Sequence, residues 1–285
     1  MNHTVWVRGF PPWCTPLRLL GPGAWALDGR SAHATLTTFA AADLDARLRG
    51  IGIGGGALSF SADPPLPRAA VRAARTTDAR RRRETSPGFT RAGTRLDEEG
   101  RYSLTPEALA LQLGERALAG RAGPPKVVDA GCGAGGNSIG FARAGCQVIA
   151  IEQHATRLAD ARHNARVYGV SDRITFLRGR VEDLLPTVTG DLLFLDPPWG
   201  PAWSRTLTTL VDLPGLAPFV DAPPPFPDVW AKVPPSFDVR AVPNATAEAW
   251  YGVAKGDERR VKFLLLRWRP AAAAVPDFES KAGPG

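Results

Sequence analysis

Residues 126–152 constrain the fold of this chain more than any other stretch. The apolar run Lys126–Ala130 predicts a buried strand, and a turn of small residues after it leads into a helical pattern over 137–144. A second apolar run, Val148–Glu152, predicts another strand. Two strands joined through a helix pair in parallel, because the helix carries the chain back to the edge from which it started. The chain therefore contains a parallel α/β unit.

The alternation of helix and strand continues on both sides of this unit. A helix over 105–118 is expected to begin with Thr105 as its cap, Pro106 at its first position and Glu107 in its first turn. The pattern predicts an α/β fold with a Rossmann-like, doubly wound, mostly parallel sheet. Its other expected elements are a helix over 155–168 and strands over 174–178, 192–195, 231–233, around Val239-Arg240 and over 261–268.

The first 67 residues differ from the rest and predict a small α+β unit of unknown role. Residues 68–95 predict a basic helical linker, whose run Arg80–Arg83 suits either a solvated helix face or contacts with nucleic-acid phosphates. A larger domain is expected over 96–270, and the tail 271–285, rich in Ala, Pro and Gly, is expected to be disordered. The elements expected in the first unit are strands over 4–7, 25–27, 34–36 and 57–60, a helix over 41–48 and a glycine-rich turn over 52–56.

The composition of the chain limits which classes of binding partner and which cellular compartments are expected. A formal charge of +7 and a pI near 9.8 are compatible with an anionic partner such as RNA or DNA. The cysteines Cys14, Cys132 and Cys146 lack metal-binding spacing, so no metal site is expected and a reducing compartment is favoured. No apolar run is long enough for a membrane span, which predicts a soluble, cytoplasmic protein without a membrane partner. The sequence leaves the oligomeric state open.

The turn after the first buried strand has the residues needed to hold a nucleoside cofactor. The pattern Gly131-x-Gly133-x-x-Gly136 lies between a strand and a helix, where small residues let the backbone approach a ligand closely. Glu152 ends the next strand, 21 residues beyond Gly131, and is placed to bind ribose hydroxyls. The strand before the turn ends with Asp129, whose carboxylate is aimed at the turn and suits a cationic ligand better than the pyrophosphate of NAD.

A second motif, Asp196-Pro197-Pro198-Trp199, follows the strand expected over 192–195. Prolines have no N–H to donate and fix their carbonyl directions, so these carbonyls and an Asp196 oxygen can accept both hydrogens of a planar amino group. Accepting them localises the lone pair on the nitrogen, which prepares it to attack a methyl group. Trp199 offers a face for base stacking, an interaction of about 1–3 kcal/mol per base. The motif predicts a methyltransferase that acts on an exocyclic nitrogen of a nucleobase.

The two motifs together resemble those of the class I S-adenosylmethionine-dependent methyltransferases. The resemblance implies S-adenosylmethionine as the cofactor, with Asp129 facing its amino-acid end and Glu152 facing its ribose. In such enzymes an acid just after the third strand usually meets the adenine. This chain has Gly179-Arg180 there, so the contact falls to Glu182 or Asp183.

Three stretches look like one branch of that superfamily, the trimethylguanosine synthases, which methylate N2 of 7-methylguanosine caps. They are residues 96–107, 127–139 and 194–200, and the resemblance covers roughly 95–205. The lead hypothesis is an RNA methyltransferase acting on guanine N2, with guanine-containing RNA, capped or uncapped, as its partner. The resemblance also implies that Trp199 stacks on the guanine. The residues that it places at the cofactor are Ser103, Thr105, Pro106, Gly131, Gly133 and Asn137.

The chain departs from this branch at Asp196, where the eukaryotic cap enzymes usually have Ser. Asp before Pro-Pro is the habit of enzymes acting on adenine N6 or guanine N2 of ribosomal RNA or DNA, so that alternative stays open. An NAD-dependent oxidoreductase is a remoter alternative, because His154 and His163 lie on the wrong side of the sheet order to donate a proton. A decayed, non-catalytic RNA-binding protein would be expected to have lost the second motif. Candidates for a second wall of the substrate site are Trp203, Trp230, Trp250 and Lys232.

Overall fold

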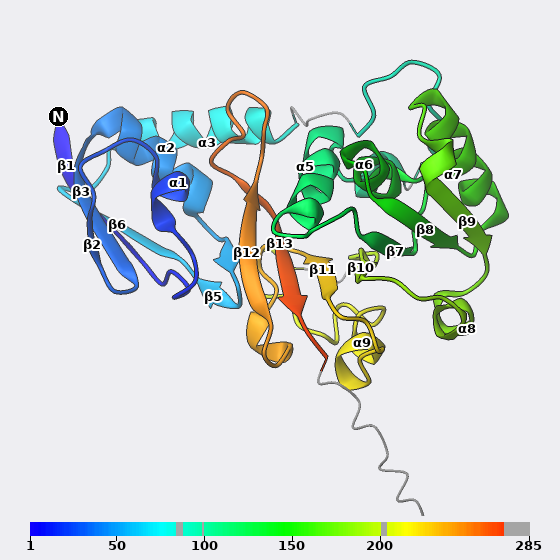
Figure 1. The fold of residues 1–285 in the computed structure, drawn as a ribbon. Coiled ribbons are helices and arrows are strands. Elements are labelled where there is room, and N and C mark those ends of the chain that lie inside the picture. Colours follow the sequence, from blue (N-terminus) through cyan, green and yellow to red (C-terminus); the bar gives the residue numbers. More distant parts are fainter. Residues whose placement is uncertain (84–87, 99, 201–203, 271–285) are drawn as a thin grey trace, which may run out of the picture.

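The computed structural model describes residues 1–83, 88–98, 100–200 and 204–270. Figure 1 shows them as two units side by side, a smaller N-terminal unit at the left and a larger α/β unit at the right. The tail predicted to be disordered, 271–285, lies outside the described residues. No helix within the described ranges is long and apolar enough to cross a membrane.

A seven-stranded sheet forms the centre of the larger unit (Figure 1). The strands on one side of it, from β9 through β8, β7 and β10 to β11, pair in parallel, whereas β13 is antiparallel to both of its neighbours. The predicted doubly wound, mostly parallel sheet is therefore confirmed. In spatial order the strands are β12 (Thr246–Tyr251), β13 (Val261–Trp268), β11 (Val229–Val233), β10 (Leu192–Leu195), β7 (Lys126–Ala130), β8 (Gln147–Glu152) and β9 (Ile174–Arg178).

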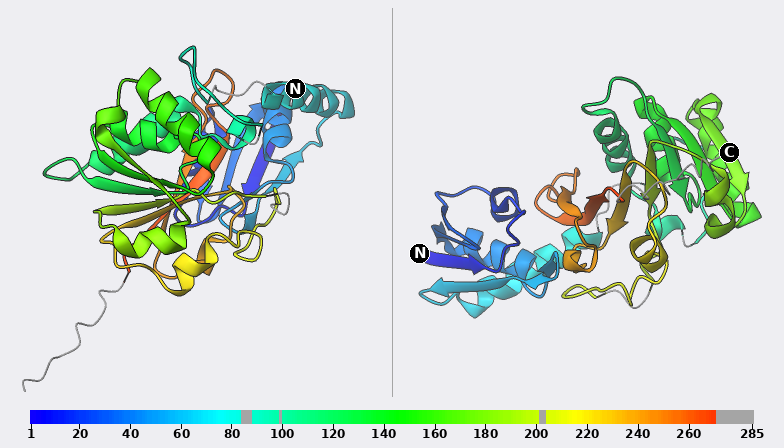
Figure 2. Two further views of the ribbon diagram at one scale, coloured as in Figure 1. Left: turned by 90° about the vertical axis from the view of Figure 1, so that its right-hand side faces the viewer. Right: turned by 60° about the horizontal axis from the view of Figure 1, so that its bottom comes forward.

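The two faces of this sheet bury two groups of apolar side chains. On one face Val127, Val148 and Phe194 pack against three helices (Figure 2). The helices are α5 (Glu107–Leu118), α6 (Gly136–Ala144) and α7 (Ala155–Val167). On the other face Val128 and Leu193 belong to a group that also includes side chains of the N-terminal unit. The shorter helices of this unit are α4 (Gly100–Ser103), η1 (Ser171–Arg173), α8 (Val181–Leu184), η2 (Leu185–Thr187), α9 (Ala217–Asp221) and η3 (Val239–Ala241).

The N-terminal unit is an antiparallel sheet with the strand order β2-β3-β1-β6. One face of this sheet is apolar, and Val5, Val7 and Leu36 pack there with Leu44 and Leu48. A longer helix, α3 (Arg68–Arg83), lies against α2 (Figure 1). The elements before α3 are β1 (Asn2–Arg8), α1 (Pro16–Leu20), β2 (Ala26–Asp28), β3 (Ser31–Thr37), α2 (Thr38–Leu48), β4 (Gly52–Ile53), β5 (Gly56–Ala57) and β6 (Ser59–Asp63).

The small hairpin β4–β5 connects the two units. The N–H of Gly52 donates to the Arg205 carbonyl at 2.8 Å. A Cβ on Gly52 would lie 1.9 Å from the carbonyl oxygen of Thr206, so glycine is needed for the backbones to come this close. An ion pair between Asp78 of α3 and Arg260 adds a second connection. The glycine-rich turn expected over 52–56 is thus where the N-terminal unit docks.

Some predicted elements were wrong in detail. Helix α5 begins at Glu107 with Pro106 as its N-cap, and Thr105 turns its hydroxyl toward Asp196 instead of capping the helix. The strand expected around Val239 is the short 3-10 helix η3, because the Asp238 side chain accepts the Arg240 N–H and bends the chain. Strand β12 escaped prediction because its alanines and glutamate have low strand propensity, and it forms by pairing along β13.

Candidate active site

The predicted site residues gather at the carboxyl ends of three neighbouring strands. Asp129 lies at the penultimate position of β7, Glu152 ends β8, and Asp196 directly follows β10. Strand β7 leads to β8 on one side of the sheet, and the chain later returns to place β10 on the other side of β7. Open α/β sheets bind ligands at such a reversal of strand order, outside the carboxyl ends of the strands.

Glycines shape the turn between β7 and α6. Gly131 and Gly133 have φ angles of +87° and +54°, a left-handed conformation that favours glycine. A Cβ at either position would meet nothing within 4 Å among the described residues, so both face open space. A Cβ on Gly136, in contrast, would lie 2.5 Å from Leu104 Cδ1. The first two glycines thus leave room for a ligand, and Gly136 lets the segment before α5 close over the turn.

Asp129 is fully buried below this turn. Its Oδ2 accepts a hydrogen bond from Ser138 Oγ at 2.5 Å, while its Oδ1 is buried and has no partner within the described part of the chain. Burial is the main cause that raises the pKa of Asp129 from 3.8 to about 7, and the carboxylates of Asp196 and Glu152 raise it too. A cationic ligand near Oδ1 would lower the free-energy cost of burying the ionised Asp129 carboxylate. The site therefore fits a cofactor that carries positive charge.

Glu152 is held by backbone groups of the same turn. Its Oε2 accepts the N–H of Gly133 at 3.0 Å, and its Oε1 accepts the N–H of His154 at 2.8 Å. These two bonds fix the carboxylate at the rim of the turn. A carboxylate fixed in this way can accept ribose hydroxyls, and that contact stays a prediction.

The residues before α5 lie beside the same turn. Thr105 is buried, and its hydroxyl lies 3.5 Å from Asp196 Oδ2. Ser103 ends α4 with an exposed side chain, and Pro106 is the N-cap of α5. Leu104, between them, is the residue that packs on Gly136. The structure thus brings this segment to the site, while its contact with a cofactor stays a prediction.

Asp196 is held by side chains from two other elements. Lys232 Nζ of β11 lies 2.8 Å from its Oδ2, and both side chains are largely buried. Asn137 Nδ2, in the first turn of α6, donates to the same oxygen at 2.9 Å. All contacts found for Asp196 within the described residues go to Oδ2. Its Oδ1 therefore remains able to accept a hydrogen bond from a substrate.

Lys232 was proposed from the sequence as a wall of the substrate site, but its ion pair with Asp196 was not foreseen. The signal was present in the strand Val229–Val233, where it is the one charged side chain. Its Nζ also lies 5.3 Å from the ring centroid of Trp199, so one ammonium group positions both an acceptor and a stacking surface. Asn137, predicted at the cofactor, donates to Asp196 in this structure, and its contact with a cofactor stays a prediction.

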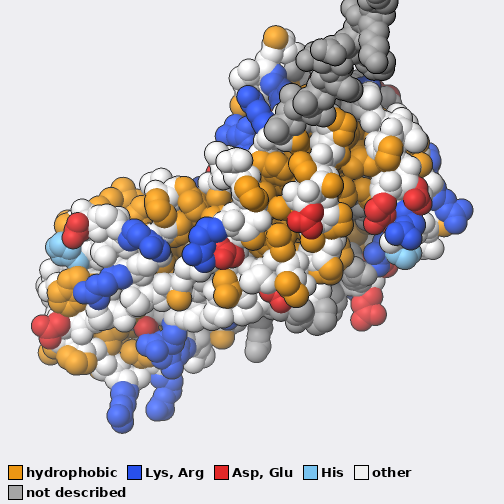
Figure 3. All heavy atoms as spheres, turned by 90° about the horizontal axis from the view of Figure 1, so that it is seen from below, with side chains coloured by type: hydrophobic (Ala, Val, Ile, Leu, Met, Phe, Trp, Pro, Cys, Tyr) orange, Lys and Arg blue, Asp and Glu red, His pale blue; other side chains and the backbone are white. Residues whose placement is uncertain are grey.

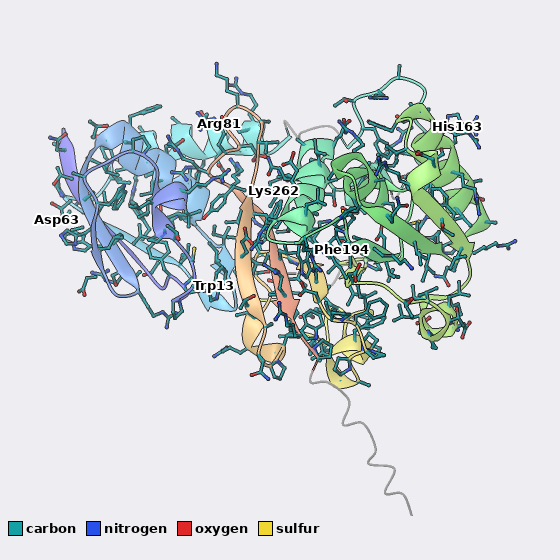
Figure 4. The ribbon with its side chains drawn as sticks, in the orientation of Figure 1. Trp13, Asp63, Arg81, His163, Phe194 and Lys262 are labelled. Atoms are coloured by element: carbon teal, nitrogen blue, oxygen red, sulfur yellow. The ribbon has the colours of Figure 1, made fainter. Side chains whose placement is uncertain are left out.

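Trp199 lies at the junction of the two units. It lines a cavity of about 230 Å³, whose other wall includes Ile53 and Arg47 of the N-terminal unit. Arg205, Arg259 and Lys262 line the cavity from the larger unit, and Lys262 is paired with Asp257 at 2.9 Å. Figure 4 shows Lys262 on the part of β13 that faces the N-terminal unit. The surface beside Trp199 is therefore rich in cationic side chains.

The remaining candidates divide into two groups. Glu182 and Asp183 are exposed in α8, just beyond the carboxyl end of β9, and their contact with an adenine stays a prediction. Trp230 and Trp250 are buried in the apolar group under α5–α7, so they pack in the core and do not form a substrate wall. Trp203 lies outside the described residues.

Comparison with known proteins agrees with this geometry. Residues 125–212 match the family model described as RNA cap guanine-N2 methyltransferase. The trimethylguanosine synthase of Schizosaccharomyces pombe is 38% identical over 129 residues, which are 42% of this chain and 53% of that protein. That of Saccharomyces cerevisiae is 33% identical over 110 residues, which are 37% of this chain and 35% of that protein. The predicted resemblance is confirmed.

A bacterial protein shares part of this region. An uncharacterized RNA methyltransferase of Gloeobacter violaceus is 46% identical over 72 residues, 25% of this chain and 16% of that protein. This chain thus spans about half the length of the first synthase and less of the other two relatives. The matched region is therefore similar to RNA methyltransferases, as the sequence predicted. The N-terminal unit lies outside the family match.

Proposed function

We propose that this protein is an S-adenosylmethionine-dependent RNA methyltransferase that methylates an exocyclic nucleobase nitrogen, N2 of guanine. The observation that carries the proposal is the state of Asp196. Its Oδ2 is occupied by Lys232 and Asn137, while its Oδ1 is left to accept a hydrogen from a substrate. Trp199, three residues further, supplies the stacking surface that a base requires.

The cofactor half of the site supports this proposal. When bound, S-adenosylmethionine supplies a methyl group on a positively charged sulfur. Asp129 would face its cationic amino-acid end, Glu152 would accept the ribose hydroxyls, and Gly131 and Gly133 give the backbone clearance that close approach requires. Glu182 and Asp183 remain the candidates for the adenine contact.

The substrate half supports attack by an amino group. Asp196 Oδ1 and the Pro197 carbonyl would accept the two amino hydrogens, which localises the lone pair on the nitrogen. Lys232 holds the Asp196 carboxylate in place through its 2.8 Å ion pair, so it acts by positioning. The nitrogen would gain the methyl group as the bond between that methyl and the cofactor sulfur breaks, the sulfur would keep the electron pair as a neutral thioether, and the proton that the nitrogen loses would pass to water.

The choice of guanine in RNA is supported by the family match to cap guanine-N2 methyltransferases. The cationic side chains beside Trp199, Arg205 and Arg259 among them, suit the phosphates of a nucleotide. Asp at position 196 favours an uncapped base, either guanine N2 or adenine N6, over a 7-methylguanosine cap. The substrate test has to separate these cases.

The test is transfer of radiolabelled methyl groups to a 7-methylguanosine cap dinucleotide, to unmodified total bacterial RNA and to bacterial DNA, in parallel. Labelled RNA is then digested to nucleosides, and the proposal expects N2-methylguanosine. Asp196→Asn should abolish the label, whereas Phe39→Ala, at an 80% exposed side chain on α2, should leave it unchanged. Label only in N6-methyladenosine or only in DNA would refute the guanine assignment, and no label with S-adenosylmethionine bound would refute RNA as the substrate.

A further inference from the structure

The connectivity of the N-terminal unit leaves one face of its sheet uncovered. Its main elements run β1-α1-β2-β3-α2-β6, and the spatial order β2-β3-β1-β6 places β1 and β3 at the centre. Leu19 and Leu20 of α1 and Leu44 of α2 are buried against the same face as Val5 and Val7. Both helices therefore cover one side. Many proteins share this connectivity, so what the other side does depends on its residues.

Strand alternation and register define the uncovered face. Trp6 of β1 is directly opposite His33 of β3, and the pairs Trp6–Ser61 and His33–Ala26 continue the same row to both edge strands. His33 is exposed and Trp6 is half-buried. Trp6 belongs to neither apolar group of the described residues, so its indole does not serve the core.

The neighbours of Trp6 on this face are small or charged. The row on one side consists of Asp28, Ser31, Arg8 and Ser59, and the row on the other side includes Thr35, Thr4 and Asp63. The serine and threonine side chains are short and project little from the sheet, which leaves the indole of Trp6 and the imidazole of His33 accessible. Arg8 reaches Ser61 with a 3.3 Å hydrogen bond and places a guanidinium group beside Trp6. Two stacking rings and a cation on a flat sheet form a surface for unpaired bases.

The charge of the chain points to the same ligand. Residues 1–83 contain twelve arginines, no lysine, five aspartates and no glutamate, so they carry the whole formal charge of +7. The remaining residues balance at 23 basic and 23 acidic side chains. Figure 3 shows several of these Arg side chains on the face of the N-terminal unit that is seen from below. This asymmetry favours binding of a polyanion by the N-terminal unit as a whole, because seven of the twelve arginines lie on α3, which packs against α2, and Arg8 lies on the open face itself.

We infer that the open face of the N-terminal sheet, built around Trp6 and His33, binds single-stranded RNA by base stacking. This site lies on a different unit from Asp196 and needs no methyl transfer to act. It gives the region outside the family match a function, namely to hold the RNA chain while the larger unit acts on one base. Single strands are preferred because the bases of a duplex are stacked on one another and unavailable to Trp6.

The test is binding of fluorescently labelled 12-nucleotide single-stranded RNA to the full-length protein, followed by fluorescence anisotropy. Trp6→Ala is expected to weaken binding roughly 5- to 150-fold, the range for one stacked base. Trp6→Phe should retain most of the affinity. Phe39→Ala, which removes an exposed aromatic ring outside this face, should bind as the wild type does. Equal affinity of Trp6→Ala and the wild type would overturn the inference, and so would equal affinity of the wild type for duplex RNA of the same length.

A second variant guards against misfolding of Trp6→Ala. Ser61 is on the open face beside Trp6, so Ser61→Glu adds a negative charge there without touching the core. It should weaken binding to single-stranded RNA as well, and unchanged binding would contradict the inference. Methyl transfer to a single guanosine nucleotide should be the same in Trp6→Ala and wild type. Failure of this inference is therefore distinguishable from failure of the proposed function.

Discussion

Replacing Asp129 by asparagine is expected to stabilise the cofactor-free protein at pH 8 and to remove most of its cofactor affinity. Asparagine has the same shape, and its carbonyl oxygen can still accept the hydrogen bond from Ser138. It has no charge to bury, however, whereas Asp129 carries its charge in a site from which water is excluded.

The size of the effect follows from the pKa. Burial is the main cause that raises the pKa of Asp129 from 3.8 to about 7. The difference corresponds to a destabilisation on the order of 4 kcal/mol when the carboxyl is charged. The Asp129 carboxyl has its ordinary pKa of 3.8 in the unfolded chain and a pKa of about 7 in the folded protein. The free energy of unfolding of the wild type therefore falls as the pH rises from 3.8 to about 7. Relative to the asparagine variant, the loss is complete above pH 7 and absent below pH 3.8.

The assay is urea unfolding of wild type and Asp129→Asn at pH 5 and pH 8, without cofactor. The variant should be more stable at pH 8, and its advantage should be smaller at pH 5. Asp221→Asn, at an exposed position in α9, serves as the control and should show no such difference. Equal stabilities at pH 8, or a larger gap at pH 5, would refute the reasoning. Calorimetry should show at least tenfold weaker binding of S-adenosylmethionine by Asp129→Asn.

Three further predictions concern the framework of the site. Lys232→Met should destabilise the protein by roughly 3–5 kcal/mol in urea unfolding, because it leaves the Asp196 charge without its partner; Lys232→Met combined with Asp196→Leu should recover much of that loss. Gly52→Ala should lower the melting temperature in calorimetry, by about 2–4 °C for each kcal/mol lost, because its Cβ would collide with Thr206. Burial raises the pKa of Glu107, but its hydrogen bonds outweigh burial and lower this pKa from 4.5 to about 2, so Glu107→Gln should be less stable than the wild type at pH 7. That loss should vanish as the pH falls from 4.5 to about 2 in acid unfolding followed by circular dichroism.

The central sheet was predictable because its signals are local. Each buried strand is a short apolar run, and each helix between two strands shows its own pattern, so the alternation alone predicts parallel pairing. The glycine turn at 131–136 and the motif at 196–199 are also local. They could be assigned to the same edge of the sheet because both follow parallel strands.

Features that depend on distant residues could not be predicted. Lys232 and Asp196 are 36 residues apart, and no sequence pattern tells which carboxylate a buried lysine will meet. The sequence predicted Thr105 as a helix cap because Pro106 and Glu107 follow it. In the structure its hydroxyl donates instead to Asp196, which is far away in the sequence. The strands of the N-terminal unit were found, but only their register reveals that Trp6 and His33 stand side by side.

The shared apolar core has a consequence for how this protein can be divided. Val5 and Leu44 of the N-terminal unit belong to the same continuous group of buried side chains as Val128 and Leu193 of the central sheet. A fragment starting at the family match would expose the apolar side chains of the larger unit that pack against the N-terminal unit, and it would tend to aggregate. The two units should therefore unfold in one cooperative transition, so that neither unit is expected to stay folded once the other has unfolded.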